Sequence, residues 1–187
     1  MKLAQSIAAF VPYNEQEVHD KRIMSALLES GQNIYTRDNE LAHLTASAWV
    51  VSPDREQVLM CYHNIYDSWS WLGGHADGEH DLAQVALREV REESGLTRLR
   101  LVSDQILSLE VLTVDGHEKR GRYVSSHLHL NVTYLIEGDP EETPRIKPDE
   151  NKAVRWFPRD EAISRSTEPW FCERIYPKLI SKSLMLV

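Results

Sequence analysis

The feature that most constrains this chain is a helical segment with three glutamates on one side, shortly after a pair of glycines. The segment, residues 81–94 (DLAQVALREVREES), is expected to end at Gly95. At about 100° per residue, Glu89, Glu92 and Glu93 project within an arc of roughly 100°. An apolar stripe of similar width adjoins them and suits a buried face; it consists of Ala83, Ala86, Leu87 and Val90. The segment therefore predicts a half-buried helix that presents three carboxylates side by side.

Carboxylates crowded in this way repel one another unless a positive charge lies among them. A solvated acidic face, relieved by Arg88 and Arg91, is the simpler interpretation. A metal site is the other, because hard ions such as Mg²⁺ and Mn²⁺ are held by a few carboxylates together with substrate phosphates. The preceding Gly73 and Gly74 favour the metal site, because glycine lets the backbone approach a ligand closely.

Together, the glycines and the acidic helix resemble the Nudix box, G-x5-E-x7-R-E-U-x-E-E-x-G-U, in which U is an aliphatic residue. Gly74 aligns with the first glycine, and residues 88–96 (REVREESGL) match the second half throughout. One position departs: the spacing places His80 where the box has its first glutamate, with Glu79 one residue earlier. We favour Glu79 as the substitute; the alternatives are that this position is dispensable or that His80 is a further metal ligand. The flanking strand pair, the WLGG sequence and a late RWF strand extend the resemblance over about residues 44–163.

The resemblance implies a metal-dependent hydrolase that cleaves a pyrophosphate linkage in a nucleoside diphosphate joined to another moiety, X. Water attacks a phosphorus atom in such enzymes. Mg²⁺ or Mn²⁺ is the implied cofactor, with Glu89, Glu92 and Glu93 as its ligands, and Arg88 would orient Glu89 or a neighbour. The general base comes from the box or from a later loop; Glu92 is the first candidate and Glu150 the second. The expected catalytic residues are therefore Glu92, Glu93, Arg88 and Glu150.

Five further residues are candidates for substrate binding. Gly73 and Gly74 would admit the ligand to the backbone, and Trp71 beside them would stack on a base. His127 and His129 alternate on one predicted strand, so both face the same side and could touch a phosphate or a metal. Each has a structural alternative: a turn, a core aromatic or a pair of half-buried polar groups. Two histidines without a third ligand do not predict zinc.

The fold class predicted from the remaining pattern is α/β, more narrowly α+β: a Nudix-type mixed sheet sandwiched between helices. Strands are expected at residues 44–51, 57–63, 105–114, 123–136 and 153–157, with a polar loop at 115–122. A final helix is expected at 168–184, kinked by Pro177.

An N-terminal helix is expected at residues 14–29, with Asn14 as its cap and Glu17 at the capping-box position. Its apolar face would consist of Val18, Ile23, Leu27 and Leu28. We divide the chain into a helical extension, residues 1–40, packed on a Nudix hydrolase domain, residues 41–187.

Composition narrows the partners of this 187-residue chain. A net charge of -8 argues against bulk nucleic-acid binding and makes a small-molecule diphosphate more plausible with cations than without. No apolar run approaches the roughly 20 residues of a membrane span, and the start is too weak for a signal peptide. Cys61 and Cys172 form no CxxC pair, so a cytoplasmic location is expected. A homodimer is compatible with everything above.

Other functions fit parts of the same pattern. A non-catalytic nucleotide- or metabolite-binding module would share the fold, but such modules usually lose box carboxylates, and here RExxEE is complete. An isoprenoid diphosphate isomerase would need a cysteine and a glutamate; Cys61 precedes the box, but its CYHN context lacks the expected signature. A structural or interaction protein with an acidic helix is the plainest alternative. Metal-dependent phosphate release separates the hydrolase from all three.

Overall fold

The computed structural model describes residues 3–65, 67–119 and 121–186, and its centre is a mixed β-sheet. Within these residues the sheet has eight strands, five of them in the order β10-β2-β1-β9-β5, while β3 pairs with β2, β4 with β1 and β6 with β9. The strands are β1 (Ala42–Val51), β2 (Gln57–His63), β3 (Ser68–Ser70), β4 (Leu72–His75), β5 (Leu99–Leu101), β6 (Ser108–Val114), β9 (His127–Gly138) and β10 (Asn151–Pro158).

The longest pairing joins β1 to β9, and these two strands run parallel. Residues far apart in the sequence therefore lie next to each other, from Ala42 beside Leu128 to Val51 beside Glu137. The β4 strand runs antiparallel to β1 on its other side, with His75 opposite Thr45. Because side chains alternate along each strand, this register decides which of them share a face.

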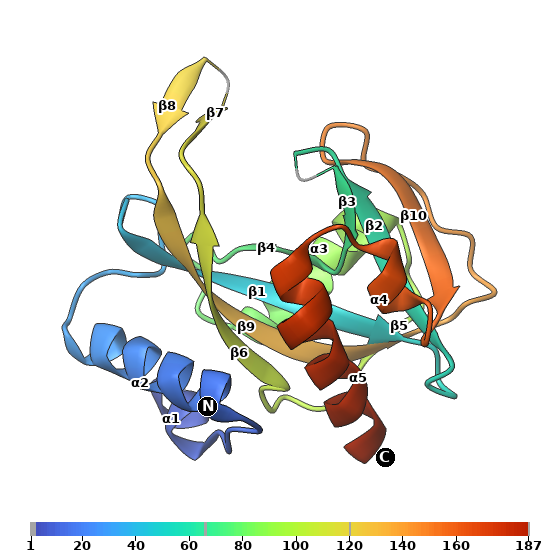
Figure 1. Cartoon of the computed structure of the whole chain (residues 1–187), viewed down its shortest axis with the longest axis horizontal. Helices are drawn as coiled ribbons and strands as arrows, with labels where there is room; N and C mark the ends of the chain where they lie inside the picture. Colours follow the sequence, from blue (N-terminus) through green and yellow to red (C-terminus); the bar gives the residue numbers. More distant parts are fainter. Residues whose placement is uncertain (1–2, 66, 120, 187) are drawn as a thin grey trace.

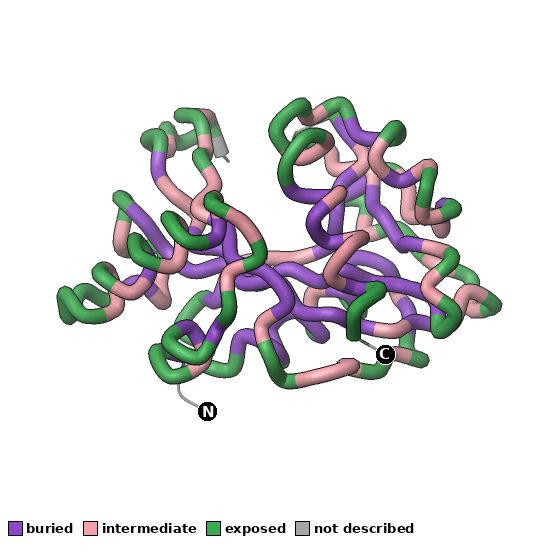
Figure 2. Tube along the Cα trace, turned by 60° about the horizontal axis from the view of Figure 1, so that its bottom comes forward, coloured by how far each residue is buried: buried purple, intermediate pink, exposed green. Residues whose placement is uncertain are grey.

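Helices cover both faces of the sheet, as Figure 1 shows, and the predicted fold class is confirmed. Helix α3 (Leu82–Ser94) packs on one face, in a core that includes Leu44, Leu130 and Leu96. Helix α5 (Tyr176–Met185) packs on the other, against Trp49 and its neighbours. The tube in Figure 2 is buried along the central strands and exposed along the outer helices and loops.

Helix α3 begins and ends where the sequence predicts. Asp81 caps its start, with Oδ1 accepting a hydrogen bond from the Gln84 N–H at 3.2 Å. Gly95 ends it with φ 69°, a left-handed conformation that glycine adopts without steric cost, and donates its N–H to the Arg91 carbonyl. The predicted apolar stripe is buried, so the strip beside it, which carries the three glutamates, is fixed in direction.

The N-terminal helices are α1 (Leu3–Ala9), which the sequence pattern did not predict, and α2 (Glu15–Glu29). Asn14 caps α2 as expected, accepting a hydrogen bond from the Glu17 N–H. The apolar face predicted for α2 is confirmed only in part: Leu27 and Leu28 pack against the core, but Val18 is 54% exposed and Ile23 39% exposed, whereas Glu17 is fully buried. The reason is tertiary, because polar residues of α2 pair with the edge strand β6, for example Gln16 Nε2 with the Leu109 carbonyl at 2.9 Å.

Three other expectations need correction. Residues 115–122 are not a plain loop, because β7 (His117–Lys119) and β8 (Arg122–Val124) form a hairpin that projects from the sheet (Figure 1). Arg120 lies outside the described residues. The strand expected at 123–136 is divided, since β9 begins only at His127.

The last predicted helix, at 168–184, is one continuous helical run over residues 169–185, but the helix type changes along its length. It comprises a π-helical turn, η1 (Phe171–Ile175), followed by α5, and a short helix, α4 (Ala162–Arg165), precedes both. Pro177 lies in the first turn of α5, directly after the π-helical residues. The chain therefore changes helix type before the proline.

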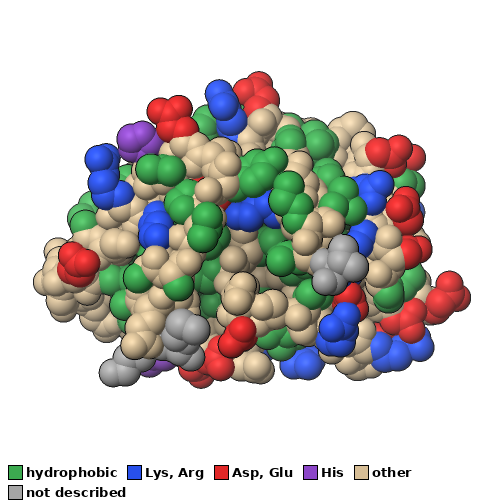
Figure 3. All heavy atoms as spheres, turned by 90° about the horizontal axis from the view of Figure 1, so that it is seen from below, with side chains coloured by type: hydrophobic (Ala, Val, Ile, Leu, Met, Phe, Trp, Pro, Cys, Tyr) green, Lys and Arg blue, Asp and Glu red, His purple; other side chains and the backbone are tan. Residues whose placement is uncertain are grey.

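The surface seen from below mixes hydrophobic side chains with scattered acidic and basic ones, and neither sign of charge dominates that face (Figure 3). In the part of the chain that the structure describes, no helix is long and apolar enough to cross a membrane.

Candidate active site

The glycine pair of β4 lies against the acidic strip of α3. The Gly73 N–H donates a hydrogen bond to Oε2 of Glu93 at 2.9 Å. A Cβ atom on Gly74 would lie 2.6 Å from the carboxyl carbon of Glu89. In the described ranges neither glycine has a positive φ, so the requirement at these positions is for space and not for an unusual backbone conformation.

Glu93 is the most deeply buried of the three carboxylates, with 3% of its surface exposed. Burial raises the pKa of Glu93 to about 8, although the hydrogen bond from Gly73 acts in the opposite direction. Its backbone is held as well, because Asn151 at the start of β10 donates from Nδ2 to the Glu93 carbonyl at 3.0 Å. The end of α3 is thereby attached to two different strands.

Arg88 contacts both of the other glutamates. Its Nη2 donates to Oε1 of Glu89 at 3.0 Å, and its Nε lies 3.7 Å from Oε1 of Glu92. Burial raises the pKa of Glu89, and the guanidinium of Arg88 counteracts that rise. The contact that the family resemblance implies, between Arg88 and Glu89, is therefore present in the structure.

Lys147 links the helix to the loop before β10. Its Nζ lies 3.2 Å from Oε2 of Glu92 and 3.0 Å from Oε1 of Glu150. These two hydrogen-bonded carboxylates raise the pKa of Lys147, although partial burial opposes the rise. The structure thus brings Glu150 to the same site as the three box glutamates. Sequence reasoning missed Lys147, because a single loop lysine carries no spacing signal.

This donor set fits a hard divalent cation. Glu89, Glu92 and Glu93 offer only oxygen ligands; Glu89 and Glu93 lie beside the glycine pair, and Glu92 contacts Arg88 and Lys147. Burial is the main cause of the raised pKa values of Glu89 and Glu93, and neighbouring carboxylates add to the rise. A bound cation would counteract both effects by stabilising the charged carboxylates.

Other predicted residues lie in more ordinary surroundings. Trp71 is 8% exposed and packs edge-on against Phe171, with ring centroids 5.5 Å apart. Glu79 accepts hydrogen bonds from the N–H groups of His80 and Asp81 in the turn before α3. The His80 ring lies 4.1 Å from that of Tyr35. The roles predicted for Trp71 and Glu79 stay predictions.

Cys61, considered for isomerase chemistry, is fully buried. Its thiol donates a hydrogen bond to the Trp71 carbonyl, and burial raises its pKa well above the usual range. A thiol in this position is held protonated within the core.

His127 and His129 share one face of β9, as the alternation predicts, and they meet two histidines that the sequence reasoning left out. His43 comes from β1 and His75 from β4, directly after the glycine pair. Nε2 of His129 lies 3.3 Å from Nε2 of His75 and 3.2 Å from Nε2 of His127. The signal available in the sequence was weak, because it depended on knowing that β1 and β9 pair in parallel.

The fold and the site together define a class of protein: a domain with a mixed sheet between helices, in which carboxylates of one helix lie against a glycine-bearing strand. The model of the NUDIX domain family matches residues 41–179, which is more than half of the chain, so the chain belongs to this family. The predicted class, a Nudix-type pyrophosphohydrolase, is confirmed by that match and by a curated relative that is named as a hydrolase.

That relative is the CMP-5'-(N-acetyl-N-hydroxy-3-aminopropyl)phosphonate hydrolase of Streptomyces rubellomurinus, 29% identical over 158 residues, with 79% of this chain and 69% of the relative covered. Solved structures with a similar fold include an Ap4A hydrolase from C. elegans (TM-score 0.54, 18% identity, covering 76% of this chain and 95% of that chain). Another is the Nudix hydrolase RenU from M. smegmatis (TM-score 0.56, 15% identity, covering 78% and 88%). At these identities the structures support the fold alone.

Proposed function

We propose that this chain hydrolyses a pyrophosphate linkage in a nucleoside diphosphate joined to a second moiety, X, with Mg²⁺ or Mn²⁺ as cofactor. The observation that carries the proposal is the placement of Glu89 and Glu93 against Gly73 and Gly74, with Glu92 on the same strip of α3. The family match makes hydrolysis the expected chemistry, and the donor atoms make a hard cation the expected ligand.

The three box glutamates would hold the cation, which would neutralise the diphosphate oxygens and make a nearby water more acidic. The chain itself positions the reacting groups. Arg88 fixes the Glu89 carboxylate through its 3.0 Å hydrogen bond, and the Gly73 N–H fixes Glu93. Such positioning matters because phosphoryl transfer depends mainly on geometry and charge stabilisation.

A carboxylate must accept the proton of the attacking water while the phosphorus–oxygen bond of the anhydride breaks. Glu92 is the first candidate for this general base and Glu150 the second. Both contact Lys147, which holds them on either side of one ammonium group. Single Glu92→Gln and Glu150→Gln variants would identify the base, because only the base variant would lose the acidic limb of the pH–rate profile, where the rate rises as the base loses its proton.

The nucleotide part of the proposal is supported by the curated relative, whose name specifies a CMP-linked phosphonate. The acidic chain, with a net charge of -8, is expected to take a polyanionic substrate only together with cations. We also propose a cytoplasmic location, which is supported by the two unpaired cysteines, Cys61 and Cys172.

The first test is the pair of variants Glu92→Gln and Glu93→Gln. We expect each to lower kcat by at least about 100-fold, because each removes one negatively charged oxygen ligand while keeping the shape of the side chain. Hydrolysis would be measured with Mg²⁺ or Mn²⁺ over a panel of nucleotide sugars, dinucleoside polyphosphates, oxidised nucleotides and non-nucleotide diphosphates. Phosphorus NMR would identify the products and therefore the bond cleaved.

The matched control is Glu29→Gln, an exposed glutamate at the end of α2. It should leave both turnover and stability unchanged. Circular dichroism must show that all three variants stay folded. Full activity of both box variants, or hydrolysis that persists in excess chelator, would contradict the proposed function.

A further inference from the structure

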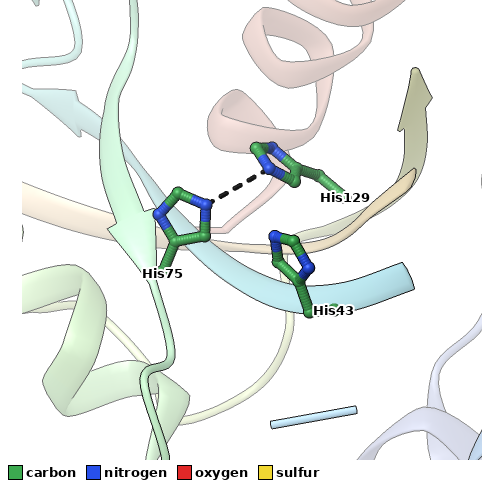
Figure 4. A group of neighbouring side chains, drawn as sticks. All are labelled: His43, His75 and His129. Atoms are coloured by element: carbon green, nitrogen blue, oxygen red, sulfur yellow. Dashed lines mark hydrogen bonds between the residues drawn. The ribbon is translucent and has the colours of Figure 1, made fainter. Parts of the chain in front are cut away.

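Outside the carboxylate site, the described chain gathers three histidines from three different strands. The parallel register places His43 on β1 directly beside His129 on β9. On the other side of β1, His75 on β4 lies opposite Thr45, two residues from His43 and therefore on the same face. Figure 4 shows the three rings turned toward one another above the strands.

The ring nitrogens are close enough for one ion to bind all three. One nitrogen from each of His43, His75 and His129 lies within 4.8 Å of the others. Nε2 of His75 and Nε2 of His129 are 3.3 Å apart. Zinc–nitrogen bonds of about 2.0–2.1 Å in a tetrahedron place neighbouring nitrogens about 3.3–3.4 Å apart.

The tautomer of His43 is suited to binding a metal. Its Nδ1 lies 3.1 Å from the Asn39 carbonyl, and because a carbonyl only accepts, Nδ1 carries the hydrogen. In the neutral ring Nε2 therefore bears a lone pair. A carbonyl behind the remote ring nitrogen is the arrangement that orients most histidine ligands of metals.

His43 also has an unmet requirement. The residue is 4% exposed, and its Nε2 has no hydrogen-bond partner among the described residues. A buried polar atom without a partner costs about 1–3 kcal/mol of stability, so hydrogen bonding among the histidines does not account for this ring. An ion within the cluster would satisfy Nε2.

We propose that His43, His75 and His129 form a second metal site, selective for a borderline ion of the zinc class. Three imidazoles suit Zn²⁺, whereas Mg²⁺ prefers oxygen ligands. Three protein ligands leave a fourth position. His127 borders it, with Nε2 3.2 Å from Nε2 of His129 and Nδ1 2.8 Å from the Ser125 carbonyl.

This site is distinct from the carboxylate site, although one strand serves both. On β4, Gly73 and Gly74 meet the glutamates of α3, and His75 joins the histidines. The nitrogen ligands of the histidine cluster would favour a zinc-class ion, whereas the oxygen ligands of the glutamates would favour Mg²⁺ or Mn²⁺. The inference rests on the histidine geometry, and it does not depend on the proposed hydrolysis.

The test is metal binding by the 187-residue chain after removal of all metals with a chelator. We expect a single tightly bound Zn²⁺ per chain by elemental analysis, retained in excess Mg²⁺. Co²⁺ in its place should give the intense visible absorption of a tetrahedral site with nitrogen ligands. His75→Gln and His129→Gln should each weaken Zn²⁺ binding by about 100-fold or more and abolish this absorption.

Two controls make the result specific. His19→Gln changes an exposed histidine on α2 and should bind Zn²⁺ as the unmodified chain does. Glu92→Gln should lose hydrolysis yet keep the cobalt absorption, which separates this site from the proposed catalytic one. The inference is overturned if the unmodified chain gives only the weak absorption of octahedral cobalt, or if Glu92→Gln abolishes zinc binding while the histidine variants keep it. The cobalt spectrum of the unmodified chain decides the matter even if a histidine variant does not fold.

Discussion

Gly73 and Gly74 are neighbours in sequence, yet the space around each is limited by a different kind of atom. A Cβ on Gly73 would lie 2.6 Å from the carbonyl oxygen of Ala46 and 2.7 Å from Cα of Ser47, which are backbone atoms of the central strand β1. A Cβ on Gly74 would lie 2.6 Å from the carboxylate of Glu89, the far end of a flexible side chain. Backbone within a sheet cannot move aside cheaply, whereas a side chain can.

The two alanine variants are therefore expected to fail in different ways. Gly73→Ala should lower the free energy of unfolding by about 1–3 kcal/mol or more, because β4 must move away from β1. Gly74→Ala should change stability by less than about 1 kcal/mol, but it displaces Glu89 and should lower kcat roughly 100-fold. Urea denaturation and steady-state kinetics of both variants measure the two effects. Equal stability losses in the two variants would contradict this account.

Single residues also show where sequence reasoning is sufficient and where it stops. The direction of Glu89, Glu92 and Glu93 was predictable, because helical periodicity and the buried stripe depend only on local sequence. The histidine cluster was not predictable from local sequence. His43 and His75 are separated by 32 positions in the sequence, and only strand pairing brings them next to His129. Periodicity states which face a residue occupies, but not which strand lies beside it.

At the scale of elements, a buried ionic network joins α2, β6 and α5. Nζ of Lys178 on α5 lies 2.9 Å from Glu110 on β6 and 3.3 Å from Glu17 on α2. Lys182 adds a second contact to Glu17 at 3.0 Å. Although burial acts to raise it, these lysines and the Tyr13 N–H bring the pKa of Glu17 below its usual range.

This network explains why the buried face of α2 could not be read from its own sequence. Hydrophobicity alone places Glu17 outside, but two lysines from a helix about 160 residues later compensate its charge inside. The helix boundaries of α2 depend on local capping and were predictable. Its orientation depends on partners that no local pattern contains.

Lys178→Met tests the network, because it leaves Glu110 buried without its cation and removes one of the two cations beside Glu17. We expect the free energy of unfolding to fall by about 3–5 kcal/mol, the usual cost of breaking a buried ion pair from one side. The control, Lys152→Met, breaks an exposed pair with Asp67 at 3.5 Å and should change stability by less than about 1 kcal/mol. Chemical denaturation at pH 7 gives both values.

A double variant tests whether the loss of stability in Lys178→Met comes from the unpaired charge of Glu110. Adding Glu110→Gln to Lys178→Met removes the charge that the first substitution leaves unpaired, so part of the lost stability should return. If the losses of stability in Lys178→Met and in Glu110→Gln simply add in the double variant, the two residues do not interact as a pair. The contribution of Lys178 to stability would then come from its packing and not from its charge.

At the scale of the whole molecule, the N-terminal helices are integral to the core of the domain. Leu3, Ile7 and Met24 belong to the same buried cluster as Leu44 on β1 and Leu130 on β9. The sequence predicts an extension, residues 1–40, packed on the hydrolase domain, residues 41–187. Shared apolar burial and the Lys178 network lead us to propose that the two parts unfold together.

We therefore expect one cooperative unfolding transition for the entire chain. All five tryptophans lie after residue 41, so their fluorescence follows the domain, whereas far-ultraviolet circular dichroism also reports on α1 and α2. In a urea titration the two midpoints should coincide. Lys178→Met should shift both midpoints together, because it weakens a contact between the two parts. An earlier transition seen by circular dichroism alone would mean that the helices of residues 1–40 unfold first and form an independent extension.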